Sequence, residues 1–259
     1  SIYKTVLRVG ARLVRDRNYY LAVTDFMNYF LSKFGIYNYD SYYNNLKWIM
    51  DVNEKEGNKV AFYFIPQATS TEFDIDSLIT LPRVRSLLKV MHNRGHEIGF
   101  HPGYMTYKNK NNFFESSKLL RRVLKDDNIF QPTIGGRQHY LRWNASYTPQ
   151  FWEFSQYNYD STLGYADKSG FRCGICYEYT MYDLINRRPF RLKQRPLIVM
   201  ETTVISDEYE GLGYTEEALK RFLYFKNVTK KYSGDFVLLW HNSSFINFAS
   251  KRIYHKLIS

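Results

Sequence analysis

The sequence predicts an α/β fold with a largely parallel sheet or barrel, and three observations lead to this prediction. Short apolar runs such as residues 59–65 have the length and composition of buried strands. These runs alternate with amphipathic segments of helical periodicity. The chain has 259 residues, of which 44% are hydrophobic and 24% charged, so it can bury a sizeable core. We therefore expect a single domain over residues 1–259.

The first half of the chain alternates strands and helices. Predicted strands cover residues 19–24, 59–65 and 96–100, and predicted helices cover residues 43–52, 84–93 and 113–124. Pro66 ends the second strand and Gly95 ends the second helix, because proline cannot donate to a ladder and glycine tolerates left-handed backbone. A loop is expected through Pro132 and the pair Gly135 and Gly136.

The second half continues the pattern with longer irregular stretches. A helix is predicted around residues 150–156 and a strand near residues 197–201. Thr215 is the expected N-cap of a further helix, since Glu216 and Glu217 follow it in the first turn, where acidic side chains are favoured. The last predicted strand covers residues 235–240.

Polar side chains follow the predicted strands at the points where a parallel sheet or barrel forms its site. They are Asp25, His101, Arg137, His139, Glu201 and His241. A single residue of this kind often only caps a strand. Several together, including three of the six histidines, indicate a functional site at the carboxyl ends of the strands.

Five motifs carry a resemblance to a known family. They are GHEIGFHP at 95–102, GGRQHYLRW at 135–143, YDSTLGYAD at 159–167, GFRCGIC at 170–176 and LLWHN at 238–242. In this order they resemble the motifs of NodB-like polysaccharide deacetylases (carbohydrate esterase family 4), closest to a bacterial branch associated with surface-polysaccharide gene clusters. The resemblance implies a distorted (β/α) barrel and a metal-dependent hydrolase that removes N-acetyl groups from a glycan, for example in lipopolysaccharide O-antigen biosynthesis.

The resemblance also implies roles for individual residues. Asp25 matches the acidic motif after the first strand, His101 the metal-binding histidine, and Arg137 the arginine that orients the catalytic base. His241 matches the general acid, and the backbone N–H of Tyr140 would contribute to the oxyanion hole. Glu201, singled out by its strand-end position alone, could orient His241 or supply another base.

The metal site departs from the family pattern in two places. The family has two neighbouring aspartates after the first strand, whereas residues 23–28 contain only Asp25, and Met105 occupies the position of a second histidine. His139 could restore a ligand, which gives Asp25, His101 and His139 as a trial set for a divalent metal, with zinc expected. If Asp25 binds the metal, the base must come from elsewhere, with Glu201 a candidate. His96 is expected to support the site rather than bind metal.

Three functions stay open on the sequence alone. The first is a glycan deacetylase with a rearranged site, acting on an N-acetylated glycan or a nucleotide-linked sugar. The second is a catalytically inactive, deacetylase-like protein that binds carbohydrate. Trp143, Tyr165 and Arg172 are the substrate-binding candidates for either function, although aromatic residues commonly serve as packing. The third is a basic scaffold for an anionic partner.

Charge and composition narrow the partners and the compartment. The net charge is +11, but the basic residues are scattered and form no recognisable nucleic-acid-binding motif, so no specific nucleic acid is expected. Cys173 and Cys176 form one C-x-x-C, half of a structural zinc site, and are expected to be two small residues in a turn. Residues 1–17 lack the pattern of a secretory signal, and no run approaches the roughly 20 apolar residues of a transmembrane helix, so we expect a cytoplasmic location.

Overall fold

The computed structural model describes Val23, Phe26 and residues 41–75, 77–245 and 247–259. Within this part, the main sheet has the strand order β1-β2-β3-β4-β6-β5. Its strands are β1 (Ala61–Phe64), β2 (Glu97–Phe100), β3 (Gly135–Gly136), β4 (Tyr159–Asp160), β5 (Tyr179–Asp183) and β6 (Arg188–Gln194). All neighbours pair in parallel except β5 and β6, which form an antiparallel hairpin. A second sheet pairs β7 (Val199–Met200) with β8 (Leu238–Leu239) in parallel.

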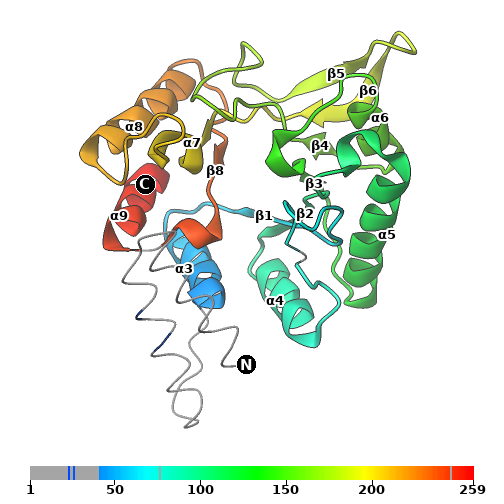
Figure 1. The fold of residues 1–259 in the computed structure, drawn as a ribbon, viewed down its shortest axis with the longest axis horizontal. Coiled ribbons are helices and arrows are strands. Elements are labelled where there is room, and N and C mark those ends of the chain that lie inside the picture. Colours follow the sequence, from blue (N-terminus) through cyan, green and yellow to red (C-terminus); the bar gives the residue numbers. More distant parts are fainter. Residues whose placement is uncertain (1–22, 24–25, 27–40, 76, 246) are drawn as a thin grey trace.

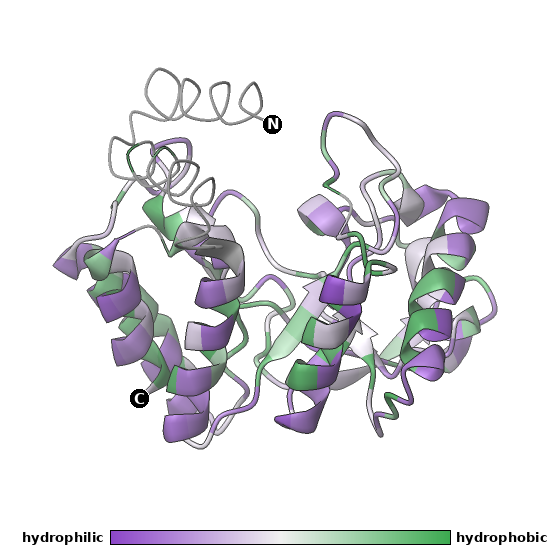
Figure 2. Ribbon diagram, turned by 90° about the horizontal axis from the view of Figure 1, so that it is seen from below, coloured by the Kyte–Doolittle hydropathy of each residue, from purple (hydrophilic) through white to green (hydrophobic). Residues whose placement is uncertain are grey.

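Helices flank the two sheets as two halves of the molecule (Figure 1). One half contains the main sheet with α4 (Pro82–Asn93), α5 (Lys110–Asp126) and α6 (Thr148–Phe154). The other contains the small sheet with α7 (Glu201–Ile205), α8 (Glu216–Lys231) and α9 (Phe248–Ile258). The helix α3 (Ser41–Lys55) lies beside α9, and the short 3₁₀ helices are η1 (Thr106–Lys108), η2 (His139–Leu141) and η3 (Asn242–Ser244). Green apolar stripes run along several of the helices (Figure 2).

The fold class and most predicted elements are confirmed. The predicted helix faces are inward, because Ile49 and Met50 on α3 and Leu88 and Met91 on α4 are buried. Thr215 caps α8 by accepting a hydrogen bond from the backbone N–H of Ala218. The predicted strand at residues 19–24 lies outside the described residues, apart from Val23, which is helical. In the described part of the chain the two sheets do not join into one closed barrel.

Two local predictions differ from the structure, and one element was not predicted. The predicted loop through Gly135 and Gly136 is wrong at the glycines, which form β3 between β2 and β4. A side chain at Gly136 would collide with the carbonyl group of Phe100 and with Trp152, so only glycine allows this approach. The predicted strand 197–201 ends at Met200, and Glu201 begins α7. The β5–β6 hairpin was not predicted.

Two apolar clusters hold the halves together. In the main half Phe100, Phe113 and Trp152 are fully buried and contact one another edge to face. In the other half Phe222 of α8 and Ile253 of α9 are fully buried in one cluster. Trp240 packs against both clusters from the segment after β8. His241 directly follows Trp240 in this segment. The packing of Trp240 therefore positions the histidine at the junction of the halves.

None of the helices in the described part combines the length and apolar character needed to cross a bilayer.

Candidate active site

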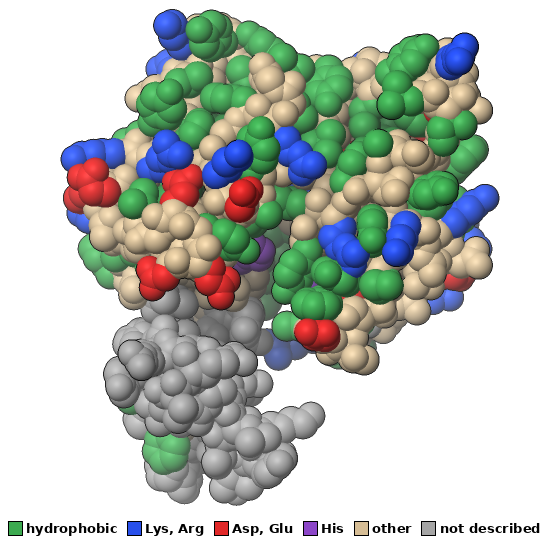
Figure 3. Space-filling model, turned by 45° about the horizontal axis from the view of Figure 1, so that its top comes forward, with side chains coloured by type: hydrophobic (Ala, Val, Ile, Leu, Met, Phe, Trp, Pro, Cys, Tyr) green, Lys and Arg blue, Asp and Glu red, His purple; other side chains and the backbone are tan. Residues whose placement is uncertain are grey.

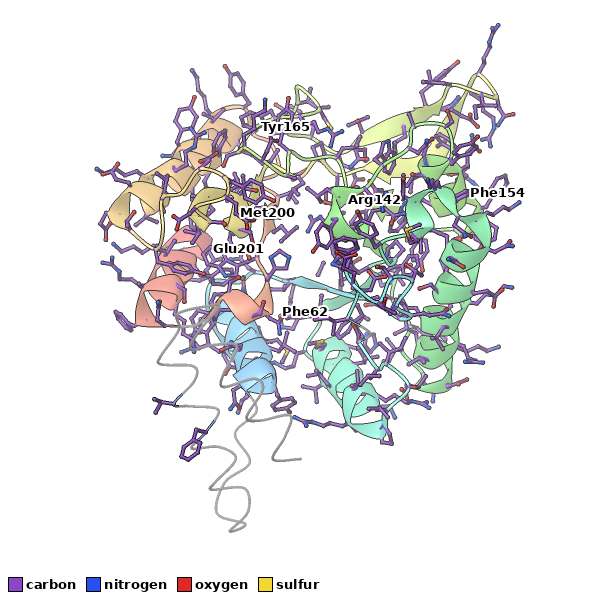
Figure 4. All side chains as sticks on the ribbon, viewed as in Figure 1. Phe62, Arg142, Phe154, Tyr165, Met200 and Glu201 are labelled. Carbon is purple, nitrogen blue, oxygen red and sulfur yellow. The ribbon has the colours of Figure 1, made fainter. Side chains whose placement is uncertain are left out.

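The candidate site forms where the carboxyl ends of the strands meet. His101 follows β2, Arg137 follows β3 and His241 follows β8. Glu201 stands at the end of β7, on the opposite half of the molecule from Arg142 (Figure 4). Histidine side chains are visible in the hollow between the two halves (Figure 3). The charge of His241 influences the pKa values of both His101 and His139, so these three imidazoles share one neighbourhood.

His101 and His139 form a pair on the main-sheet side. Their ring centroids are 4.9 Å apart, with the planes at 68°. Nδ1 of His101 donates to the carbonyl oxygen of Arg137 at 2.5 Å, and Nδ1 of His139 donates to Oδ1 of Asp74 at 2.7 Å. Each imidazole is therefore oriented through Nδ1, which leaves Nε2 as the nitrogen with a lone pair. Metal-binding histidines are commonly held in this way by a carbonyl or carboxylate.

Burial keeps this histidine pair neutral. It lowers the pKa of His101 to about 3, and repulsion between the two rings further disfavours charging both. Burial also lowers the pKa of His139, although the hydrogen bond to Asp74 opposes the shift. Both imidazoles are unprotonated near pH 7, which is the state that a metal requires of its ligands.

Glu201 and His241 form a second, ionic pair on the other half. Glu201 is 1% exposed, and its Oε1 accepts hydrogen bonds from His241 Nδ1 at 2.6 Å, His241 N at 3.0 Å and Ser244 Oγ at 2.8 Å. Burial opposes the charge of both partners, but their mutual attraction outweighs it. The pKa of His241 is therefore raised and that of Glu201 is lowered. About half of the His241 side-chain surface, 48%, is exposed, so the imidazole is accessible.

Arg137 is a buried cation between these two pairs. Its side chain donates from Nε to the carbonyl oxygen of Ser161 and from an Nη to the Ser161 hydroxyl, both at 2.8 Å. The guanidinium lies over the ring of Tyr63, 5.2 Å from its centroid. Burial lowers its pKa, while Asp160 and Glu201 oppose the shift. These contacts fix Arg137 without a direct carboxylate partner among the described residues.

Tyr140 and the substrate-binding candidates lie around these groups. Tyr140 (φ 57°) and Leu141 (φ 52°) both have left-handed backbone, which costs about 1–3 kcal/mol per residue and is frequent at functional sites. Trp143 packs against the main core, so part of it serves as packing. Tyr165 lies on the segment that connects the two halves (Figure 4), with the Lys168 ammonium 4.6 Å from its ring centroid. Arg172 donates to the carbonyl oxygen of Gly164 at 2.9 Å.

Sequence reasoning missed two buried carboxylates. Asp74 lies in the loop between β1 and α4 and contacts His139. Asp160 ends β4 and accepts hydrogen bonds from the backbone N–H and the hydroxyl of Thr162. Burial raises the pKa of Asp160 to about 7, against those hydrogen bonds. Asp160 lies within a quoted motif and directly ends a strand, so the strand-end rule could have identified it. The position of Asp74 carries no comparable sequence signal.

The structure describes two of the three residues in the trial set of metal ligands. His101 and His139 fit a divalent metal, because both are neutral and oriented through Nδ1. Asp25, the third residue of the trial set, lies outside the described residues. Among the described residues there is no group of three or more histidine, cysteine, aspartate or glutamate side chains that could hold a metal ion. Met105 is partly exposed, and its backbone N–H donates to Thr69 Oγ1.

The structure also describes His96 and the two cysteines. His96 is a supporting group, since its side chain is fully buried and its Nε2 lies 3.0 Å from Oε1 of Glu54. Its Nδ1 accepts from the backbone N–H of Val60 at 3.2 Å, which anchors the start of β1 to β2. Cys173 and Cys176 are both free thiols, as expected of small residues in a turn.

No family model matches the sequence, and no curated protein sequence matches it. The fold is similar to that of a protein from Mycobacterium smegmatis described as a polysaccharide deacetylase, with a TM-score of 0.61 and 15% identity over 83% of this chain and 69% of that chain. A probable polysaccharide deacetylase from Pseudomonas aeruginosa PAO1 follows with a TM-score of 0.54 and 12% identity, and an allantoinase with 0.52 and 12%. For both, 83% of this chain and 65% of the other are covered.

These structural similarities confirm the predicted fold, which the chain shares with proteins described as polysaccharide deacetylases. Because the identities are 12–15%, they establish the fold and leave the chemistry to the side chains present here. The chain spans only 65–69% of the length of these neighbours.

Proposed function

We propose that this protein is a metal-dependent hydrolase that removes N-acetyl groups from a bacterial surface polysaccharide or its precursor. One observation carries the proposal: histidines with opposite pKa shifts share the strand-end hollow. The pKa values of His101 and His139 are lowered, which favours the neutral form, whereas Glu201 raises the pKa of His241, which favours the protonated form. Amide hydrolysis needs both kinds of group, because water must be activated and the departing amine must receive a proton. The fold shared with described polysaccharide deacetylases supports the same assignment.

His101 and His139 would hold the metal, with zinc expected, and Asp25 would be the third ligand. A divalent metal would, when bound, polarise the acetyl carbonyl and lower the pKa of a water molecule. The two imidazoles contribute by presenting Nε2 lone pairs whose orientation is fixed from Nδ1. If Asp25 binds the metal, it is not the base, and another carboxylate must take the proton from water.

His241 is the proposed general acid. Its Nδ1 donates to Glu201 at 2.6 Å, so Nε2 is the nitrogen that can pass a proton to the amine leaving group. Glu201 raises the pKa of His241 and thereby favours the protonated form that a general acid needs. Because Oε1 of Glu201 is taken up by His241 and Ser244, orientation of the acid is the role that its contacts favour. Oε2 has no hydrogen-bond partner in the described part of the chain, so Glu201 retains an open acceptor.

Arg137 and Tyr140 would stabilise negative charge in the same hollow. The buried guanidinium of Arg137 would be a fixed cation for the carboxylate that acts as base, and the N–H of Tyr140 would donate to the oxyanion. Trp143, Tyr165 and Arg172 would contact the sugar. The substrate is proposed as an N-acetylated glycan or a nucleotide-linked sugar.

A second candidate is a catalytically inactive protein that binds carbohydrate through the same hollow. One observation favours it: the described residues hold no group of three potential metal ligands. This candidate predicts glycan binding without acetate release, and binding that is insensitive to metal removal.

Acetate release separates the two candidates. The full chain, stripped with a chelator and reloaded with zinc or cobalt, would be incubated with a tetramer of N-acetylglucosamine and with UDP-N-acetylglucosamine. The deacetylase proposal predicts metal-dependent acetate release that His241→Ala abolishes while circular dichroism stays unchanged. Glycan binding in the absence of any acetate release would support the inactive protein instead.

A further inference from the structure

Asp74 is a buried carboxylate at the centre of three loops. Its side chain has 0% exposure, and it lies between β1 and α4. Oδ2 accepts from the backbone N–H of Thr69 at 2.7 Å, the hydroxyl of Thr69 at 2.9 Å and the backbone N–H of Ser70 at 3.0 Å. Oδ1 accepts from the backbone N–H of Tyr104 at 2.8 Å and from Nδ1 of His139 at 2.7 Å. The carboxylate therefore connects its own loop to the loops after β2 and β3.

The loop after β2 packs directly against Asp74 at Gly103. A Cβ added at Gly103 would lie 2.6 Å from Oδ2 of Asp74 and 2.6 Å from Oγ1 of Thr69. Glycine at this position is what allows the loop after β2 to reach the carboxylate. A fully buried carboxylate with this many donors is rigid, because each lost hydrogen bond would leave a buried polar group unpaired.

The contacts of Asp74 decide which nitrogen of His139 carries the proton. Every group around the two oxygens is a donor, so His139 must donate from Nδ1. In a neutral imidazole the other nitrogen, Nε2, then has the lone pair. His139 packs against His101, which is oriented in the same sense by the carbonyl oxygen of Arg137.

We propose that Asp74 is the positioning residue of the His101 and His139 pair: it fixes the Nδ1–H tautomer of His139 and so makes Nε2 available to a metal ion. The inference rests on the proposed function for the metal, but the tautomer itself does not depend on metal. The contact with Asp74 would orient His139 as a metal ligand, although His139 is not at one of the usual ligand positions of the family.

Asp74→Asn provides a sharp test because it keeps the shape and replaces one acceptor by a donor. We expect the side-chain oxygen of the introduced asparagine to take the Oδ2 position, because there it can accept hydrogen bonds from the backbone N–H groups of both Thr69 and Ser70. The amide NH₂ would then face His139 and turn its Nδ1 into an acceptor. The variant is therefore expected to convert His139 to the Nε2–H tautomer, which cannot bind a metal through Nε2.

The measurement is a long-range ¹H–¹⁵N spectrum of the metal-free full chain, with His139 assigned through His139→Gln. Wild type is expected to show an Nδ1–H imidazole at His139, and Asp74→Asn an Nε2–H imidazole. Thr69→Val is the matched control, since it removes one hydroxyl donor to the same carboxylate and leaves the His139 contact intact. An Nε2–H tautomer in wild type overturns the proposal even if Asp74→Asn does not fold, and so does an unchanged tautomer in the folded variant.

Zinc affinity, measured by competition with a chromogenic chelator, is the second readout. Asp74→Asn is expected to weaken zinc binding by about 10–100-fold, the usual effect of losing a residue that supports a metal ligand, while Thr69→Val changes it little. Equal losses in both variants would indicate a merely structural role and overturn the proposal. A wild-type chain that binds no zinc would contradict the proposed function, while the tautomer would still decide the role of Asp74.

Discussion

The two histidine clusters of the site use the same side chain in opposite electrostatic settings. His101 and His139, on the main-sheet half, are oriented by a carbonyl oxygen and by a carboxylate already saturated with donors, and burial lowers both pKa values. His241, on the small-sheet half, faces Glu201, whose Oε1 lies 2.6 Å from its Nδ1, and its pKa is raised.

The difference shows how partners, and not residue type, assign roles to histidines. A carboxylate contacts a histidine in both clusters. At His139, burial outweighs the carboxylate of Asp74 and the pKa is lowered. At His241, burial is outweighed by the ion pair with Glu201 and the pKa is raised. Lone pairs for a metal and a proton for a leaving group can thus exist side by side at one pH.

The largest effect on the reaction rate is expected from removing His241. His241→Ala should lower the rate of acetate release by about 10²–10⁴-fold, because it removes the general acid. The change also leaves the buried Glu201 carboxylate without its ion-pair partner, so some loss of stability is expected beside the loss of rate. Acetate assays, with thermal unfolding as the fold control, test this, and an unchanged rate would remove His241 from the mechanism.

Removing a histidine of the His101 and His139 pair should reduce metal binding more than any other property. His101→Ala is expected to abolish stoichiometric zinc binding, because it removes one of the two described imidazoles offered to the metal. Elemental analysis after zinc incubation and desalting gives the readout. Zinc retained by the folded variant at the wild-type level would place the metal elsewhere. His96→Gln is a control within the same motif, since His96 contacts Glu54 and Val60 instead.

The carboxylate of the ionic pair should control pH dependence. Glu201→Gln removes the charge that raises the pKa of His241, so the alkaline limb of the rate profile should move to lower pH. His241 contributes fully to the stability of the pair at pH values below the histidine pKa of the unfolded state. This contribution is lost as pH rises through the raised pKa of His241 in the folded state. The contribution from Glu201 is present above the unfolded carboxyl pKa and is lost as pH falls through the lowered one. An unmoved alkaline limb would contradict this coupling.

Asp160 offers a smaller effect on stability. Burial raises its pKa in the folded state to about 7, whereas an unfolded aspartate has a pKa of about 4. Between about pH 4 and pH 7 the folded state therefore holds a proton that the unfolded state has already released. Stability should therefore fall as pH rises across this window, and Asp160→Asn should remove that part of the slope. Urea unfolding of both proteins at pH 5 and pH 7.5 measures it. Parallel slopes would show that Asp160 is ionised throughout.

The smallest effect is expected at the cysteine pair. Cys173→Ser should leave zinc content and acetate release unchanged, because both thiols are free and neither belongs to the proposed set of metal ligands. A loss of zinc in this variant would indicate that the C-x-x-C takes part in metal binding.

Much of the fold follows from the sequence because its causes are local. Apolar spacing identified α3, α4 and α5, and Thr215 identified the start of α8. The glycine pair of β3 was predicted to be a loop, since its role depends on the approach of Phe100 and Trp152, which no local pattern records. In the hairpin of β5 and β6, charged residues of β6 alternate with the buried Phe190 and Leu192, and this pattern was overlooked.

The candidate site was predictable to the extent that it lies on strand ends. His101, Arg137, His139, Glu201 and His241 were named on that basis. The pairing of Glu201 with His241 joins residues 40 positions apart, and that of Asp74 with His139 joins residues 65 apart. Asp74 lies in a loop ten residues after β1, so only the tertiary structure reveals that it orients a histidine.

Acetate release as a function of zinc added to the metal-stripped chain is the decisive measurement for metal-dependent deacetylation by this protein. We predict that release from the N-acetylglucosamine tetramer or from UDP-N-acetylglucosamine rises with zinc, saturates near one equivalent, and is lost in His101→Ala. The account would be contradicted by release that is independent of zinc, or by the absence of acetate from both substrates at every zinc concentration.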